Sequence, residues 1–182
     1  MTLTMRNKHI QKNLAKKTPK LLFGLAILVL LQGCGIYSFT GTTLSPDLKT
    51  VTIQNFGIGV AGGPQDLTID FNEALKEYYQ RNTNLKLVPA EGDLFLGGSV
   101  VKYEMTPLAT TASDKAAMNR LTVTVEVSFQ NSMTEDESFE KEFSFYQDFP
   151  QEQSLTDVEM SLVPKIIDQL VLDIFGATAA QW

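Results

Sequence analysis

The only cysteine of the chain, Cys34, stands where a covalent lipid would be attached. It closes the tetrapeptide Leu31-Gln32-Gly33-Cys34, which follows an apolar run over residues 21–31 with lysines just upstream. A charged start, a short apolar segment and small residues at the cleavage position are typical of a secretory signal peptide. The run is shorter than the roughly 20 apolar residues that cross a bilayer. We therefore predict cleavage between Gly33 and Cys34 and acylation of Cys34, in preference to a buried structural cysteine.

After removal of the predicted signal peptide the chain would have no histidine and one acylated cysteine, which excludes most catalytic chemistry. The only histidine, His9, lies in the predicted signal peptide. Ser-His and Cys-His nucleophiles are therefore excluded, as are zinc sites built from His and Cys. The glycines over residues 57–63 follow a strand but lack the Gly-Lys-Ser/Thr of a phosphate-binding loop, and no pair of carboxylates stands out. We predict no catalytic residue, no metal ligand and no cofactor.

Loss of the signal peptide also changes the charge. The whole chain has a formal charge of −6, from 15 basic and 21 acidic side chains. Residues 1–33 hold six of the basic side chains and no acidic one, which leaves 149 residues with a charge of about −12. Such a chain is a poor partner for nucleic acid, because that binding depends on neutralised phosphates. Its length suits a single domain with a substantial core.

Alternating apolar and polar side chains predict five strands. They span residues 50–56, 85–88, 94–105, 121–130 and 139–145. Gly97 and Gly98 inside the third strand predict a bulge or a close approach of two backbones. Lys141 interrupts the apolar set of the last strand, which indicates a position near the edge of the sheet. We expect residues 57–64 and 106–117 to form loops.

A helical apolar period predicts a first helix from a cap at Asp66 to about Arg81. Its apolar stripe consists of Leu67, Phe71, Ala74, Leu75 and Tyr78. We expect this stripe to face the core and not a ligand.

A second helix is predicted to begin at Ser154 or Thr156, where Thr156 and Glu159 have the spacing of a capping box. Pro164 lies in its early turns and would kink the helix or delay its start. Gly176 suits the C-terminal cap.

The order strand, helix, four strands, helix predicts an α+β fold. Two helices would pack on one face of a four- to five-stranded mixed sheet, after a cleaved lipoprotein signal peptide. The expected organisation is a signal peptide over residues 1–33, a lipidated linker over 34–48 and one α+β domain over 49–182.

The chain resembles the LptE family of lipopolysaccharide-assembly lipoproteins, particularly its Bacteroidetes-type members. The resemblance covers nearly all of the chain after residue 33, in order and with compatible spacing. It is carried by Cys34-Gly35-Ile36-Tyr37-Ser38-Phe39, Val51-Thr52-Ile53-Gln54-Asn55-Phe56, Phe71-Asn72-Glu73-Ala74-Leu75-Lys76, Asn119-Arg120-Leu121-Thr122-Val123 and Gln169-Leu170-Val171-Leu172-Asp173-Ile174-Phe175. These motifs are structural and not catalytic.

This resemblance implies a non-enzymatic role at the outer membrane, on its periplasmic side. Members of the family are anchored in outer-membrane lipid by the acylated cysteine, which is Cys34 here, and sit as a plug inside the β-barrel partner LptD. Together they place lipopolysaccharide in the outer leaflet. Some members bind lipopolysaccharide through basic residues near a sheet loop, and the positions here are Lys115 and Arg120. A polar sheet face suits a polar barrel interior.

One alternative remains open at this point. A lipoprotein facing the periplasm could carry an apolar or glycolipid ligand between its helices and its sheet, and it would need a sizeable apolar pocket there. A hydrolase based on Asp or Glu has the weakest support, since no spacing favours it.

Overall fold

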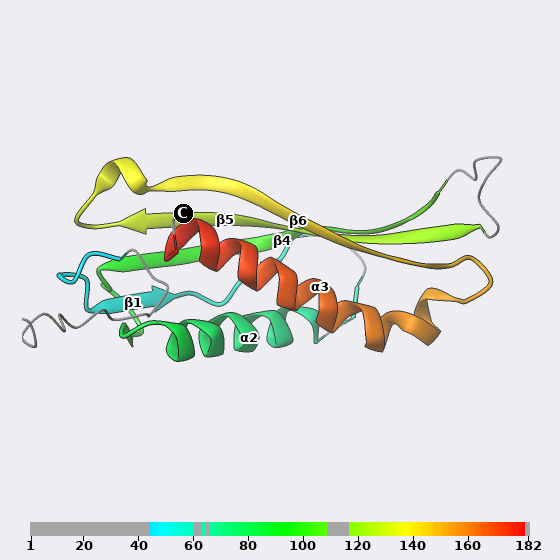
Figure 1. Ribbon diagram of the computed structural model, residues 1–182, viewed down its shortest axis with the longest axis horizontal. Helices are drawn as coiled ribbons and strands as arrows, with labels where there is room; N and C mark the ends of the chain where they lie inside the picture. Colours follow the sequence, from blue (N-terminus) through cyan, green and yellow to red (C-terminus); the bar gives the residue numbers. More distant parts are fainter. Residues whose placement is uncertain (1–43, 60–62, 65, 109–116, 181–182) are drawn as a thin grey trace, which may run out of the picture. The chain divides into compact units, whose positions relative to one another are not determined.

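The computed structural model describes residues 44–59, 63–64, 66–108 and 117–180, which belong to one compact unit, residues 40–182 (Figure 1). The predicted signal peptide and most of the linker lie outside the described residues. In chain order the elements are β1 (Thr50–Ile53), β2 (Gly57–Ile58), α2 (Leu67–Asn82), β3 (Lys86–Leu87), β4 (Leu94–Pro107), β5 (Met118–Asn131), the 3₁₀ turn η2 (Glu135–Glu137), β6 (Phe139–Pro150) and α3 (Leu155–Thr178).

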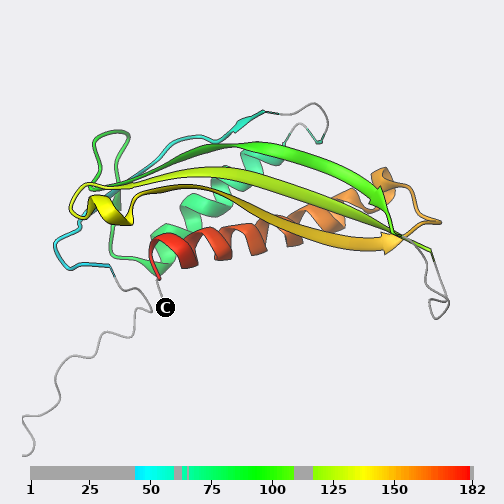
Figure 2. The same ribbon diagram turned by 90° about the horizontal axis from the view of Figure 1, so that it is seen from above.

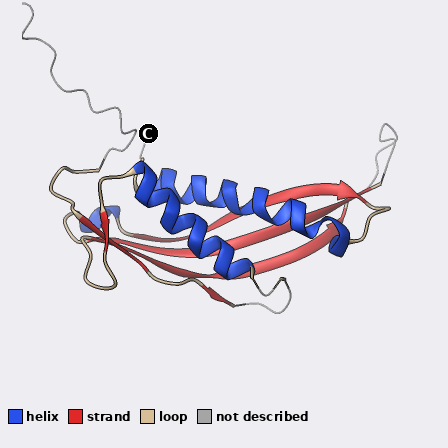
Figure 3. Ribbon diagram, turned by 90° about the horizontal axis from the view of Figure 1, so that it is seen from below, coloured by secondary structure: helices blue, strands red, loops and turns tan. Residues whose placement is uncertain are grey.

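The strands form one mixed sheet in the order β3-β1-β4-β5-β6, with β2 beside β4. β1 is parallel to β3 and β4, whereas β4, β5 and β6 are antiparallel neighbours. Both helices cover the same face of the sheet (Figures 2 and 3). The predicted α+β fold is therefore confirmed.

The sixth strand, β2, falls where the sequence predicted only a loop. Gly57 and Ile58 pair with Ser99 and Val100 of β4, and the N–H of Gly59 donates to the carbonyl of Val100 at 2.8 Å. Two residues are too few to show a period, which explains why the pattern missed this strand.

The core lies between the sheet and the two helices. Residues that alternate along β5 all face the helices and are buried: Leu121, Val123, Val125, Val127 and Phe129. The α2 stripe is largely as predicted, with Leu67, Phe71 and Leu75 buried. However, the predicted stripe contained Tyr78, which is only partly buried, and did not contain Tyr79, which is fully buried.

Tyr79 joins the ends of the two helices. Its ring packs edge-on against Phe175 of α3, with 5.1 Å between centroids, and its hydroxyl is hydrogen-bonded to the hydroxyl of Thr178. Burial raises the pKa of Tyr79, although the Thr178 hydrogen bond opposes that effect. The phenol thus stays neutral, and its polar atom is satisfied inside the core.

The predicted helix ends are partly wrong. Asp66 stands at the N-cap of α2 but makes no side-chain capping bond. Ser154, one of the two predicted starts, is the N-cap of α3, and its hydroxyl donates to the Asp157 carboxylate at 2.6 Å. The capping box of Thr156 and Glu159 does not form, because Thr156 already lies inside the helix.

α3 also continues past both residues that were expected to interrupt it. Pro164 lies inside the helix, and Gly176 is within its last turn and does not cap it. The helix ends at Thr178, with Ala179 as the C-cap; the N–H of Ala179 donates to the carbonyl of Phe175 at 2.8 Å.

Gly98 marks the close backbone approach that the sequence predicted. A Cβ at this position would lie 1.9 Å from the carbonyl oxygen of Glu126 on β5 and 2.7 Å from the Phe56 ring. The pairing of β4 with β5 is also irregular between Val100 and Lys102. Only a glycine fits between these two strands at Gly98.

Candidate functional site

Three of the four predicted site residues lie outside the described residues. These are Gly33 and Cys34 at the predicted cleavage site and Lys115 in the connection between β4 and β5. The fourth, Arg120, lies two residues after the start of β5, beside that connection, so its surroundings are known.

Arg120 is held by two residues of β6. Its Nε and Nη2 atoms donate to the two carboxylate oxygens of Asp148 at 2.7 and 2.9 Å, and its guanidinium carbon lies 3.5 Å from the centre of the Tyr146 ring. Arg120 and Asp148 are opposite each other in the β5–β6 register. The sheet therefore fixes both partners of the ion pair.

This arrangement limits what Arg120 can bind. The hydrogen bonds from Arg120 lower the pKa of the Asp148 carboxyl, so the carboxylate stays ionised and neutralises the guanidinium. The pair uses two of the five N–H donors of the arginine. The remaining N–H groups can donate to a phosphate oxygen, although Asp148 competes with any anion for the charge.

Tyr103 ties this end of the sheet to α3. Its hydroxyl donates to a carboxylate oxygen of Glu159, and its ring lies against Gly63, where a Cβ would be 3.2 Å from the ring. Burial and the Glu159 carboxylate both raise the pKa of Tyr103. Glu159 therefore contacts β4 and does not cap its own helix.

The face of the sheet that points away from the helices is mostly polar. The β4–β5 and β5–β6 registers place these side chains on it: Phe95, Ser99, Lys102, Glu104 and Thr106 from β4, Arg120, Thr122, Thr124, Glu126, Ser128 and Gln130 from β5, and Glu140, Glu142, Ser144, Tyr146 and Asp148 from β6. We call this surface the open face. It carries carboxylates, amides, hydroxyls and few cations, so it suits a polar partner better than a lipid.

Asp93 organises the opposite end of the sheet. One of its carboxylate oxygens accepts hydrogen bonds from the backbone N–H groups of Lys49 and Thr50 and from the Thr50 hydroxyl, each at 2.8 Å. These bonds, the Lys49 N–H first, lower the pKa of Asp93. Asp93 thus fixes the segment that leads into β1.

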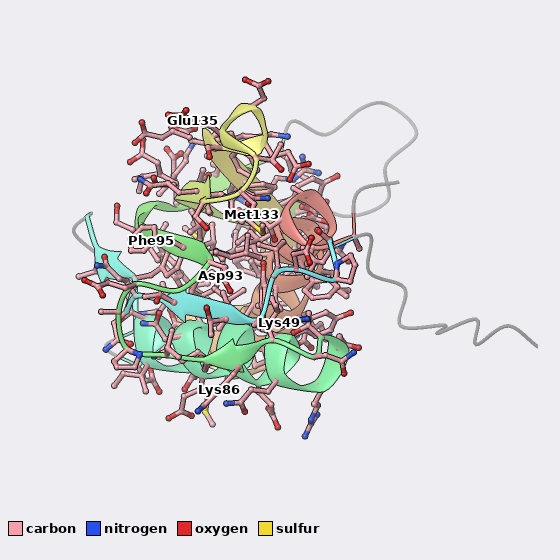
Figure 4. The ribbon with its side chains drawn as sticks, turned by 90° about the vertical axis from the view of Figure 1, so that its left-hand side faces the viewer. Lys49, Lys86, Asp93, Phe95, Met133 and Glu135 are labelled. Carbon is pink, nitrogen blue, oxygen red and sulfur yellow. The ribbon has the colours of Figure 1, made fainter. Side chains whose placement is uncertain are left out.

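Figure 4 looks onto this end, with Asp93 between Met133 and Glu135 on one side and Lys86 on the other. Two cavities open here. One, of about 290 Å³, includes Leu44, Met133 and Thr178 in its lining, and the other, of about 650 Å³, is lined mainly by polar residues including Asp93 and Gln130. Neither has the apolar lining that a lipid chain requires.

The space between helices and sheet is filled by side chains. Phe56 packs on Phe71 with 5.2 Å between ring centroids, and Phe129 packs on Phe139 at 5.3 Å. Leu75, Leu170 and Ile174 are fully buried. The described interior therefore offers no support for the alternative in which an apolar ligand lies between these layers.

A buried contact that the sequence did not predict joins α2 to the sheet. The N–H of Phe56 donates to the Asn72 side-chain oxygen at 2.8 Å, and the Asn72 amide donates back to the Phe56 carbonyl at 3.2 Å. Asn72 thereby serves both backbone groups of a residue between β1 and β2. The apolar period gave no signal for it, because an asparagine beside the stripe looks like a surface residue.

The described residues offer no metal site and no membrane-spanning helix. Within 44–59, 63–64, 66–108 and 117–180, no three His, Cys, Asp or Glu side chains are grouped to hold a metal ion. No helix in that part of the chain is both long enough and apolar enough to cross a bilayer.

Several solved structures are similar to this chain at low identity. A minor lipoprotein from Acinetobacter baumannii is 18% identical over 70% of this chain and 89% of that one, with a TM-score of 0.44. Lipoprotein B from Nitrosomonas europaea is 15% identical over 70% and 79%, with a TM-score of 0.46. Rare lipoprotein B from Shewanella oneidensis is 15% identical over 69% and 89%, with a TM-score of 0.46. No curated protein matches the chain.

The family is shown by a sequence model. The model named LptE, described as lipopolysaccharide-assembly, matches residues 48–177, which is well over half of the chain. This range includes the whole sheet, α2 and all of α3 except its last residue, Thr178. The chain belongs to the LptE family of lipopolysaccharide-assembly proteins.

Proposed function

We propose that this chain is a non-catalytic lipoprotein of the outer membrane that acts with a large LptD-type β-barrel to place lipopolysaccharide in the outer leaflet. It would serve as plug and assembly factor for that barrel. The observation that carries the proposal is the family match over residues 48–177.

The surface chemistry of the domain supports a plug role. Interiors of large outer-membrane barrels are polar, and the open face offers carboxylates, amides and hydroxyls to such a wall. Because the helices already bury the other face, the open face is the broad sheet surface left for a partner. A plug also needs no net positive charge, which agrees with an acidic chain.

The proposed anchor is an acylated Cys34, after removal of a signal peptide over residues 1–33. Each acyl methylene buried in lipid contributes about 0.8 kcal/mol, so several chains give effectively permanent attachment. The ten residues 34–43 would span at most about 35 Å when extended. The domain would therefore stay close to the periplasmic side of the membrane.

Contact with lipopolysaccharide is proposed at the end of the sheet near Arg120. The β4–β5 connection carries Lys115, and Arg120 lies beside it with N–H donors that Asp148 does not use. Both cations would meet phosphate groups of the lipid, although Asp148 reduces the contribution of Arg120.

The test is affinity purification of the tagged full-length protein from outer membranes, with mass identification of its partners. A large barrel protein in stoichiometric amount is expected. Recovery of the protein alone, at high yield and in mild detergent, would overturn the plug role. The matched variant is Cys34→Ser, which should appear in the periplasm or as uncleaved precursor. If it still resists carbonate washing in the membrane fraction, the lipid is not the main tether.

A further inference from the structure

The outer edge of β6 has backbone groups that the sheet leaves unpaired. β6 ends the strand order, and β5 is its only neighbour among the described strands. Among the described residues, no backbone hydrogen bond outside the β5–β6 ladder involves Phe139 to Phe149. The strand has 12 residues, so the edge is about 40 Å long. It is long enough to pair with a complete strand.

The helices do not cover this edge. α3 packs beneath β6 against the inner face of the sheet, and the view from above in Figure 2 looks onto β6 with no described element in front of it. The edge is therefore available to another chain.

The charges along β6 alternate between its two faces. Glu140 and Glu142 point to the open face, whereas Lys141 lies on the helix side, 5.1 Å from the centre of the Phe143 ring. Glu126 of β5 is directly opposite Glu142. None of these three glutamates forms an ion pair with another described residue. Like charges placed opposite each other destabilise a sheet, so a positively charged side chain bound beside these three glutamates would stabilise the sheet.

A second copy of the chain is a poor partner for this edge. In a symmetric antiparallel pair centred on Lys141, lysine would face lysine and Glu140 would face Glu142. An inward-pointing lysine on an edge strand is a known means of preventing edge-to-edge association. The same charges would favour a different strand with the opposite pattern.

We propose that the outer edge of β6 binds an extended segment of another protein by strand addition. The segment would place basic side chains opposite Glu140 and Glu142, an acidic one opposite Lys141, and apolar ones beside Phe139 and Phe143. Backbone hydrogen bonds would give the affinity, and the alternating charges would select the partner. The proposal holds whether or not a barrel protein is the partner.

The experiment measures binding of labelled peptides to the purified full-length protein by fluorescence anisotropy. The probe is Thr-Val-Lys-Glu-Lys-Val-Thr, which reads the same in both directions and so fits either strand orientation. The control, Thr-Lys-Val-Glu-Val-Lys-Thr, has the same composition and charge but places all three ions on one face. Both peptides place their central Glu opposite Lys141, so the probe gains two further charge pairs, with Glu140 and Glu142, and should bind about tenfold more tightly than the control.

Two further measurements separate strand addition from general attraction. Two methylated forms of the probe are made, one with methyl groups on the odd-numbered backbone nitrogens and one with them on the even-numbered nitrogens. Only one side of an added strand faces β6, so one form should lose binding and the other should keep it. The exposed charges of the protein are then exchanged in the triple variant E140K/K141E/E142K. That variant should prefer Thr-Val-Glu-Lys-Glu-Val-Thr over the original probe.

Four results would overturn the proposal. Equal affinity for probe and control, equal loss with both methylated sets, or an unchanged preference in the triple variant would each show that the edge does not bind a strand. A stable dimer in light scattering, with β6 amides protected from hydrogen exchange, would show that the occupant is a second copy.

Discussion

Replacing Asn72 with alanine is expected to loosen the junction between α2 and the sheet. The Asn72 side chain is buried and serves both the N–H and the carbonyl of Phe56, at 2.8 and 3.2 Å. Phe56 is itself buried, and its ring packs on Phe71. Alanine lacks both the side-chain oxygen and the amide group, so the N–H and the carbonyl of Phe56 would each lose a hydrogen-bond partner.

The size of the effect follows from burial. Each buried polar group that loses its partner costs about 1–3 kcal/mol. Partial access of water to Phe56 would reduce this cost, so we expect Asn72→Ala to lower the free energy of unfolding by about 2–4 kcal/mol. With a urea dependence of about 1.5–2 kcal/mol per molar, the midpoint should fall by about 1–3 M.

The assay is urea unfolding of the full-length protein, followed by both near-ultraviolet circular dichroism, which reports on buried rings such as Tyr79, and far-ultraviolet circular dichroism to test for a single transition. A loss below about 0.5 kcal/mol would refute the reasoning, because the Phe56 groups would then be satisfied without Asn72.

Asn72→Asp separates the two hydrogen bonds. An ionised carboxylate still accepts from the Phe56 N–H but turns its second oxygen toward the Phe56 carbonyl, and both burial and this repulsion would raise the pKa of the N72D carboxyl. Its protonated form donates to that carbonyl. Relative to Asn72→Ala, N72D should therefore gain stability at low pH and lose it as the pH rises through the raised pKa. A constant difference between the two variants across pH would contradict the assigned donor.

Two more results are expected from the same structure. Gly98→Ala should lower the free energy of unfolding in urea by at least about 2 kcal/mol, because its Cβ would lie 1.9 Å from the Glu126 carbonyl. Gly176→Ala lies in a helix with open space around it and should instead raise that free energy by about 0.5–1 kcal/mol. Equal effects of the two substitutions would contradict the close approach at Gly98. Asp148→Asn should release Arg120 and strengthen salt-sensitive binding of lipopolysaccharide, a gain that Arg120→Ala in the same background should remove. Since Arg120 lowers the pKa of Asp148, the wild-type ion pair contributes stability above the usual carboxyl range and loses it as the pH falls through the lowered value.

Periodicity was sufficient for most of the fold. The clean alternation over Leu121 to Phe129 predicted β5 because every second side chain is buried by the helices. Lys141 correctly indicated an edge strand, since a charge in the apolar set is tolerated where one side of the strand is open. The double glycine likewise predicted the close approach at Gly98. Each of these signals is local and repeats along one element.

Ends and turns were less predictable because several residues compete for the same role. Thr156 and Glu159 have the spacing of a capping box, yet Ser154 caps α3 two residues earlier. Gly176 resembles a C-cap, but the helix continues since Thr178 meets Tyr79 and the terminal alanines are buried. At Gly176 tertiary contacts therefore outweigh the local preference, whereas at the start of α3 one local candidate, Ser154 with Asp157, replaces another.

The candidate surfaces depend on pairs that are distant in sequence, and no local pattern contains them. Arg120 resembles a free loop cation until the register of β5 with β6 places Asp148 opposite it. Glu140 and Glu142 resemble ordinary solvated charges until the same register adds Glu126 and the strand order leaves β6 without a second neighbour among the described strands. One strand pairing therefore neutralises the predicted anion-binding arginine and concentrates unpaired acid along an open edge. For this domain, the partner-binding properties follow from the sheet register more than from composition, because register decides which charges are already paired.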